Sequence, residues 1–536
     1  MTKLYINGKF YINQGIFAQA VLVENGRFVA VGTTEEVIAA ASDSENKIID
    51  LGGRTVLPGF NDSHMHLYGV GMLQGILKLN RCRSIKDCVQ AGLEYIAEKS
   101  VLPGQTIVAK LWNQENFTDS SNYLTCYDLD KISTQHPIVA YRACSHIASC
   151  NSLALEMANI GSDTVSPHGG EIYRDDNLQP TGVLAENAIE LIKGILPQPN
   201  IEETAEIIES AMLYAASHGI TSVQTNDVRD GNFADMLAAY SRVYDAGQAV
   251  LRTYHQCFFS DTANFAKFVE AGYFTGYGDD MFKIGPLKMF ADGSLGGRTA
   301  ALQQPYHDAP ETKGIFTMTP EHLDNMIDAA EAAGFSCAVH AIGDGAMDMV
   351  LTAFEKTTSG ENTRRHGIIH CQITDLAILR RMAQGGILAL VQPVFLHEDA
   401  KIITSRVGPQ LAKTSYAWAT MDDMGINVSY GTDSPVEGLC PIDNIHSAVN
   451  RLGLDGEMTE PFNPSECVSV AQAIDSYTIG SAFASFDENK KGRIAPGFLA
   501  DMCVLDKDIF EIDKSKILSV GVDMTILGGE VVYQKK

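Results

Sequence analysis

His64 and His66 are separated by a single residue and follow a mostly apolar segment at residues 57–60. Side chains two apart on a β-strand share a face, so both imidazoles would point at one spot. Imidazole nitrogens are common zinc ligands, and a catalytic zinc usually has three protein ligands. The spacing therefore predicts a metal site that other residues of the chain complete.

Four further ligand candidates each lie near the end of a short apolar run: Lys288, His340, His370 and Asp433. Taken singly, either of these histidines is more simply a half-buried residue without a ligand role. Their shared placement favours ligands, because the carboxyl ends of the strands in a parallel barrel meet in one mouth. With the histidine pair, they predict a metal-dependent hydrolase.

Lys288 lies inside the apolar stretch 284–290, where a buried ammonium loses its hydration and needs a partner or the loss of its charge. One interpretation is a salt bridge to Asp292 or Asp433. The other is a neutral amine that has reacted with carbon dioxide. The resulting carbamate has two oxygens, which could bridge two metal ions.

Asp433 precedes Ser434 and Pro435, a position where aspartate often caps a turn. As a metal ligand, its carboxylate would also accept the proton of the attacking water, whose pKa falls to about 7 on zinc. Asp433 is therefore the predicted general base.

Weaker candidates for substrate contact are spread along the chain, and each could equally be a surface or packing residue. Arg298 follows the glycine-rich segment 292–297, where backbone could approach a ligand closely. That segment matches neither a Walker motif nor a dinucleotide-binding motif. The full set is Trp112, His146, Asn151, Glu186, Arg298, Gln392 and Glu437.

Composition narrows the class of protein. The 536 residues contain 40 Lys plus Arg against 66 Asp plus Glu, a net charge of −26 that argues against a nucleic-acid partner. The eleven cysteines lack a C-x-x-C pair or small-domain spacing, which favours a reducing cytoplasm over a disulfide framework. The sequence shows no signal-peptide core and no apolar run of membrane-spanning length, so we expect no membrane partner.

Strand and helix signals alternate through the middle of the chain, which indicates repeated βα units and a parallel sheet. Eight predicted strands favour a closed α/β (β/α)8 TIM barrel over an open sheet. They cover residues 55–66, 219–226, 252–259, 283–290, 335–341, 366–372, 387–393 and 426–431. Residues 67 to about 215 are too long for one connection and are interpreted as an insertion with its own strands and helices.

Short alternating runs punctuated by glycine occupy both chain ends and predict antiparallel strands. Neither end is long enough to bury a core alone. Residues 1–56 and 492–536 are therefore predicted to complete one small β domain together, with residues 57–491 forming the barrel.

The motifs resemble the amidohydrolase superfamily, in the branch that includes N-substituted formamide deformylases. The resemblance covers nearly the whole chain and is carried by segments 57–66, 288–296, 340–344, 433–436 and 492–501, and by His370. It implies a distorted barrel with a β-sandwich built from both ends, and zinc or a similar metal at the barrel mouth. It also implies that His64, His66 and Asp433 bind one ion, that His340 and His370 bind a second, and that Lys288 bridges them if carboxylated.

The leading hypothesis is a hydrolase of a small-molecule substrate, in which water activated by one or two divalent metal ions attacks a non-peptide C–N bond of an amide, formamide or cyclic amide. One alternative is a deaminase of a heterocyclic amine with a single metal ion and an ion-paired Lys288. A second is a catalytically silent relative that binds a ligand. The outer helices of a barrel also allow a homo-oligomer.

Overall fold

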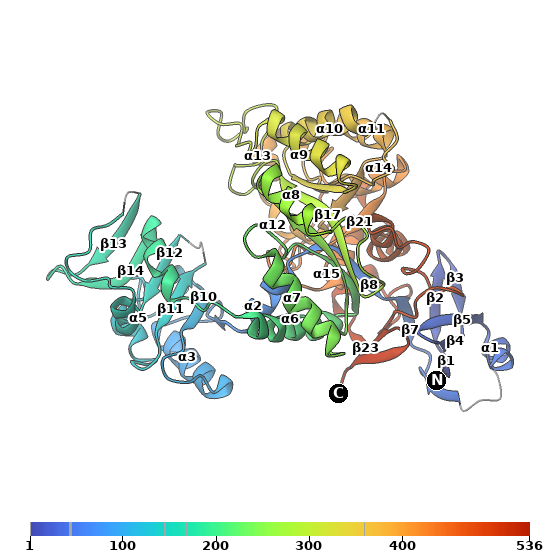
Figure 1. Ribbon diagram of the computed structural model, residues 1–536, viewed down its shortest axis with the longest axis horizontal. Coiled ribbons are helices and arrows are strands. Elements are labelled where there is room, and N and C mark those ends of the chain that lie inside the picture. Colours follow the sequence, from blue (N-terminus) through green and yellow to red (C-terminus); the bar gives the residue numbers. More distant parts are fainter. Residues whose placement is uncertain (1, 42–45, 144–145, 168, 359) are drawn as a thin grey trace. The chain divides into compact units, whose positions relative to one another are not determined.

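The computed structural model describes residues 2–41, 46–143, 146–167, 169–358 and 360–536 (Figure 1). The chain divides into two compact units. The first contains Met1–Gly71 and Ile201–Lys536, and the second contains Met72–Asn200.

The centre of the first unit is an eight-stranded sheet in the order β21-β20-β19-β18-β17-β16-β15-β8, with every hydrogen-bonded neighbour parallel. Helices between successive strands pack against it and share its core. The strands are β8 Phe60–Met65, β15 Ile220–Thr225, β16 Arg252–Phe258, β17 Phe282–Phe290, β18 Cys337–Ala341, β19 Gly367–His370, β20 Leu388–Val391 and β21 Val428–Tyr430. The main intervening helices are α6 Ile201–Ala216, α7 Phe233–Asp245, α8 Thr262–Glu270, α9 Pro320–Ala332, α10 Asp344–Thr358, α11 Leu376–Gly385 and α14 Trp418–Asp423.

Helix α9 shows why these segments fold as predicted. The side chain of Thr319 accepts a hydrogen bond from the backbone of His322, and Pro320 occupies the first turn, where its missing N–H is not needed. The buried residues of the helix recur at three- and four-residue spacing, which places one apolar stripe against the barrel core. They are Leu323, Met326, Ile327 and Ala330.

The two outer strands of the sheet, β8 and β21, meet beyond their ends. The backbone N–H of Asp433 donates to the carbonyl of His64 at 2.8 Å, and that of His66 donates to the carbonyl of Ser434 at 2.8 Å. Gly431 permits this approach, because a Cβ there would lie 2.6 Å from the nitrogen of His64. The sheet is therefore a nearly closed barrel, which confirms the predicted fold class.

A buried carboxylate also links β8 to the chain that follows β21. Asp62 on β8 accepts hydrogen bonds from the backbone and hydroxyl of Thr432, with the hydroxyl at 2.7 Å, and from the hydroxyl of Tyr477 at 3.3 Å. Burial raises the pKa of Asp62 to about 7, although these hydrogen bonds act in the opposite direction. The side chain therefore joins the first and last barrel strands beside two candidate ligands, His64 and Asp433.

The first unit holds two further sheets, of which the six-stranded one combines strands from both chain ends, and Figure 1 shows the blue and red strands side by side. β22 pairs antiparallel with β7, and residues from both ends share one apolar core. The four-stranded sheet has β5 Arg27–Gly32, β4 Ala20–Glu24, β1 Thr2–Ile6 and β6 Asn46–Asp50. The six-stranded sheet has β24 Glu530–Gln534, β23 Val522–Leu527, β22 Met502–Leu505, β7 Thr55–Pro58, β2 Lys9–Asn13 and β3 Ile16–Ala18. The domain boundaries at residues 56 and 492 stay a prediction.

Two details of the expected strands were wrong. Residues 55–66 form two strands, with β7 in the end-built sheet and β8 in the barrel, and the chain changes sheet at Gly59, whose Cβ position would lie 2.1 Å from Thr221. The end strands are also not all antiparallel, since β1 pairs parallel with β6 and β2 pairs parallel with β7.

The second unit holds a mixed six-stranded sheet in the order β13-β14-β12-β11-β10-β9. Its strands are β13 Gly170–Arg174, β14 Pro180–Glu186, β12 Ile147–Cys150, β11 Ile138–Arg142, β10 Ile107–Trp112 and β9 Leu77–Lys78, and its longest helix is α3 Ile85–Lys99. The unit lies within the predicted insertion. Residues 184–186 finish β14, and Asn187–Ile195 follows directly as a 3-10 helix.

None of the helices in the described ranges combines the length and apolar character that crossing a membrane requires.

Candidate metal centre

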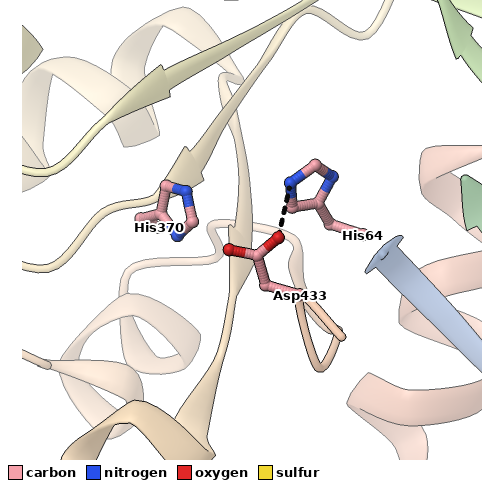
Figure 2. Close-up of side chains that lie close together, drawn as sticks. All are labelled: His64, His370 and Asp433. Carbon is pink, nitrogen blue, oxygen red and sulfur yellow. Dashed lines mark ion pairs between the residues drawn. The ribbon is translucent and has the colours of Figure 1, made fainter. Parts of the chain in front are cut away.

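His64, His370 and Asp433 form a buried cluster at the carboxyl end of the barrel. One ligand atom from each side chain lies within 4.8 Å of the others, and Figure 2 shows the carboxylate of Asp433 between the two imidazoles. His64 is the penultimate residue of β8, His370 ends β19, and Asp433 follows β21. His66 also contacts this carboxylate. The Nε2 of His66 lies 3.2 Å from Asp433 Oδ1, and the Nε2 of His64 lies 3.3 Å from the same oxygen.

The hydrogen bonds behind His64 and His66 fix which ring nitrogen carries the proton. The Nδ1 of His66 faces the carbonyl oxygen of Asn226 at 3.3 Å, and a carbonyl only accepts. The Nδ1 of His64 faces the amide oxygen of Gln256 at 2.6 Å. That amide is oriented because its nitrogen donates to the carbonyl of Ser63 at 3.0 Å. Both histidines therefore donate from Nδ1 and present the Nε2 lone pair to Asp433.

His370 is held in the same way. Its Nδ1 lies 2.7 Å from the amide oxygen of Gln392, whose nitrogen donates to the carbonyl of Leu390 at 3.1 Å. Burial lowers the pKa of His64 to about 4 and that of His370 well below its usual range, so both rings are neutral at neutral pH.

These assignments test whether the site fits a metal ion. A carboxylate oxygen and several imidazole lone pairs converge in a buried space, and Asp433 Oδ1 receives no hydrogen bond from any described residue. Acceptors facing one another without a donor repel, and a divalent cation among them would remove that repulsion. The donor set and its outer hydrogen bonds fit a metal centre.

His340 lies beside this cluster at the end of β18. Its ring centroid is 4.4 Å from that of His370, and its Nε2 lies 3.0 Å from the carbonyl of Gly293 and 3.3 Å from a carboxylate oxygen of Asp292. Asp292 is itself anchored by three backbone N–H groups, those of Ala301, Ile342 and Gly343.

Lys288 is fully buried on β17. No described residue accepts a hydrogen bond from its Nζ, which lies 4.6 Å from the ring centroid of Phe290. Neither expected salt bridge is therefore formed, with Asp292 or with Asp433. Burial lowers the pKa of Lys288 to about 7, although the charge of Asp433 acts to raise it.

The backbone turns sharply at two of these positions. His370 has a φ of 81° and Asp433 a φ of 53°, in the left-handed region that non-glycine residues seldom adopt. Such conformations concentrate at functional sites, where the surrounding structure holds them in place. Here they aim both side chains at the same point.

Gln256, which sequence reasoning missed, gives a first testable prediction. We expect Gln256→Leu to weaken metal binding about 10- to 100-fold, because His64 loses the acceptor that fixes its tautomer. The measurement is the dissociation constant for zinc, from competition with a chromogenic chelator. Gln256→Glu keeps an oxygen facing His64 and should retain most of the affinity. An equal loss in both variants would mean that the glutamine acts only through packing.

Two of the predicted substrate contacts are structural residues of the second unit. Trp112 is buried in an apolar core and its indole N–H donates to the carbonyl of Ala140 at 2.9 Å. Asn151 is buried at the start of α5 Ser152–Met157, where its amide oxygen accepts from the backbone of Ala154 and Ile138. Both side chains are engaged by these interactions, and substrate contact by either residue stays a prediction.

The other five predicted contacts have different surroundings. His146 and Glu186 form an exposed ion pair at 2.9 Å on the second unit. Arg298 makes two hydrogen bonds to Asp308, at 2.9 and 3.1 Å, so its head group is already paired. Gln392 holds His370, as described above. Glu437 lines a small cavity near the cluster. Substrate contact by any of these five residues stays a prediction.

Reasoning from the sequence also missed Asp62 and Asn226. Asp62 lies within β8 and Asn226 directly follows β15, and both strands are buried although most of their residues are polar. Their partners come from other strands, so the role of each became clear only in the folded chain.

Comparisons with known proteins agree with this arrangement. A sequence model of the amidohydrolase family matches residues 47–533. The chain is 33% identical to the putative amidohydrolase YtcJ of Bacillus subtilis, covering 100% of both chains, and 28% identical to the N-substituted formamide deformylase of Arthrobacter pascens, covering 97% of this chain and 95% of that one. The crystal structure of an uncharacterized metal-dependent hydrolase from Pyrococcus horikoshii has a TM-score of 0.80 at 27% identity, covering 96% of this chain and 99% of that one.

A parallel barrel with histidines and an aspartate converging at its carboxyl mouth defines the class of metal-dependent hydrolases. The chain belongs to the amidohydrolase family, which confirms the resemblance found in its motifs. It is therefore an enzyme that hydrolyses C–N bonds of small molecules, and its cluster indicates a divalent metal ion.

Proposed function

We propose that this enzyme cleaves a non-peptide C–N bond in an amide, a formamide or a cyclic amide. The observation that carries the proposal is the convergence of neutral imidazole lone pairs and the Asp433 carboxylate without an intervening donor, at a barrel mouth. The similarity to a formamide deformylase supports this substrate class.

The proposed ligands divide into two groups. His64, His66 and Asp433 would hold one ion, most suitably zinc because of the nitrogen-rich donor set. His340 and His370 would hold a second, with Lys288 bridging the two as a carbamate. When bound, the metal polarises the scissile carbonyl and makes water more acidic.

The chain's own groups supply the remaining chemistry. Asp433 is buried among the proposed ligands, and we propose that its carboxylate takes the proton of the attacking water and delivers it to the departing amine nitrogen. His64 and His370 are held neutral with their Nε2 atoms inward by Gln256 and Gln392. This preorganisation limits the rearrangement needed when the substrate binds.

The test combines metal analysis with a substrate panel. Protein purified without chelators and with bicarbonate should contain about two equivalents of metal. It should release benzylamine from N-benzylformamide or open a cyclic amide such as dihydrouracil. One equivalent of metal and release of ammonia from an aminopurine would instead support the deaminase. A folded protein with no bound metal and no turnover would support the silent ligand-binding relative.

A cytoplasmic location and a homo-oligomer also remain predictions. Fractionation of the native host and light scattering of the purified protein would test them.

A further inference from the structure

A cavity of about 220 Å³ lies among the loops that follow β17 to β21. Its lining comes directly after the candidate ligands in the chain. Ile342 follows His340, Gln372 follows His370, and Glu437 follows Asp433. The cavity is therefore placed to receive the part of a substrate next to the bond being cleaved.

The charged groups of this lining are all carboxylates. Glu398, Asp399 and Glu437 contribute carboxylates, and no Lys, Arg or His is among the described lining residues. Glu437 is half-buried, and no hydrogen bond or ion pair to it is found among the described residues. Burial, then the neighbouring carboxylates Glu398 and Asp399, raise the pKa of Glu437 to about 7, and a bound cation would relieve that repulsion.

Gln372 is a second, independent sign of a ligand. Its side chain lines the cavity and only 3% of the residue is exposed. Its amide nitrogen donates to Asp399 at 3.2 Å, which fixes the orientation of the amide, and its Oε1 receives no hydrogen bond from the described residues. A buried acceptor of this kind is normally satisfied, so a donor from a ligand is the missing partner.

Asp399 itself is not free. Besides Gln372, the hydroxyl of Tyr416 donates to the same oxygen of Asp399, Oδ2, at 2.5 Å, and this oxygen therefore orients Gln372. Glu398 lies at the exposed rim and pairs with Lys401 at 3.4 Å. The acceptors that remain for a ligand are chiefly Glu437 and the Oε1 of Gln372.

The rest of the lining is apolar. Phe395, Leu295, Ile342 and Val436 contribute to it, and the ring of Phe395 stacks on that of His370 with centroids 5.7 Å apart. Carboxylates beside an aromatic face suit an organic ammonium group, whose N–H bonds reach the acceptors and whose carbon atoms contact the apolar walls. A bare metal ion would gain nothing from those walls.

We propose that this cavity binds a protonated amine, so that the substrate is an amide or formamide carrying a cationic nitrogen near the scissile C–N bond. That the bound amine belongs to a substrate rests on the proposed function, but binding of the ammonium group itself is independent of turnover. Glu437 supplies the charge and Gln372 the oriented neutral acceptor.

The experiment is isothermal titration of the metal-loaded protein with n-butylammonium chloride, and with n-butanol as a neutral probe of the same length. We expect the ammonium to bind and the alcohol not to bind measurably. Glu437→Gln should weaken ammonium binding roughly 10- to 100-fold, as expected for the loss of a charge-assisted hydrogen bond. The matched control is Glu270→Gln, at the exposed end of α8, which should bind like the parent protein.

The outcomes separate this inference from the proposed function. Ammonium binding that depends on Glu437, in a protein with no amide hydrolysis, would keep the inference and reject the function. Amide hydrolysis without ammonium binding, or with equal binding of the alcohol, would overturn the inference alone. A decrease in bound metal in Glu437→Gln, with ammonium binding unchanged, would overturn it by assigning Glu437 to a metal ion.

Discussion

Asp433→Asn is expected to lower the rate of C–N bond hydrolysis by roughly 10²- to 10⁴-fold, the range for a lost general acid–base group. The replacement removes the negative charge that His64 and His66 surround, and an amide cannot take the proton of the attacking water. Asparagine is preferable to alanine for this test. Residue 433 has a φ of 53°, a conformation that asparagine accepts readily, so that loss of activity is not confused with backbone strain.

The measurement is kcat/KM on a substrate that the parent enzyme hydrolyses, together with the metal content of each protein. Asp328→Asn is the matched control, because it removes the same charge from an exposed position of α9. It should keep full activity. Near-parental activity in Asp433→Asn would rule out Asp433 as the base, and a changed circular dichroism spectrum would require Asp433→Glu in its place.

The barrel was predictable because its signals are local. Strands such as β19 and β20 are short and mostly apolar, helices such as α9 have a stripe at three- and four-residue spacing, and parallel topology then brings the strand ends together. For this reason, His64, His370 and Asp433 could be grouped before any coordinates were known, although 369 positions separate the first from the last.

Other features depend on partners distant in sequence. Nothing near Gln256 indicates that its amide would meet His64, and nothing near Trp112 indicates that its indole would be buried against Ala140. The break at Gly59 has the same origin, since the space is filled by Thr221 from β15. Sequence reasoning therefore found the groups that converge on the site, but not those that hold them in place.

Lys288→Ala is expected to lower metal content from about two equivalents to about one and to slow hydrolysis by roughly 10²- to 10³-fold. A second metal ion contributes several kcal/mol of transition-state stabilisation, and each 1.36 kcal/mol corresponds to a factor of ten. The structural reason is the position of Nζ, which is fully buried and lacks an acceptor among the described residues. A permanent ammonium there would be costly, whereas a carbamate would be stabilised by the cations it bridges. Lys86→Ala, at an exposed position of α3, is the control.

The truncated side chain leaves space in which small molecules can distinguish the two interpretations of Lys288. If the lysine acts as a carbamate, acetate or propionate should restore both the second metal equivalent and part of the activity of Lys288→Ala. If it acts as an amine, ethylamine should restore activity without a change in metal content. Protein labelled with ¹³C-bicarbonate adds a readout independent of turnover, because a carbamate carbon should be visible by NMR in the parent protein and absent in Lys288→Ala. Parental metal content and rate in that variant would instead favour a single-metal site, in which Lys288 has no part in the chemistry.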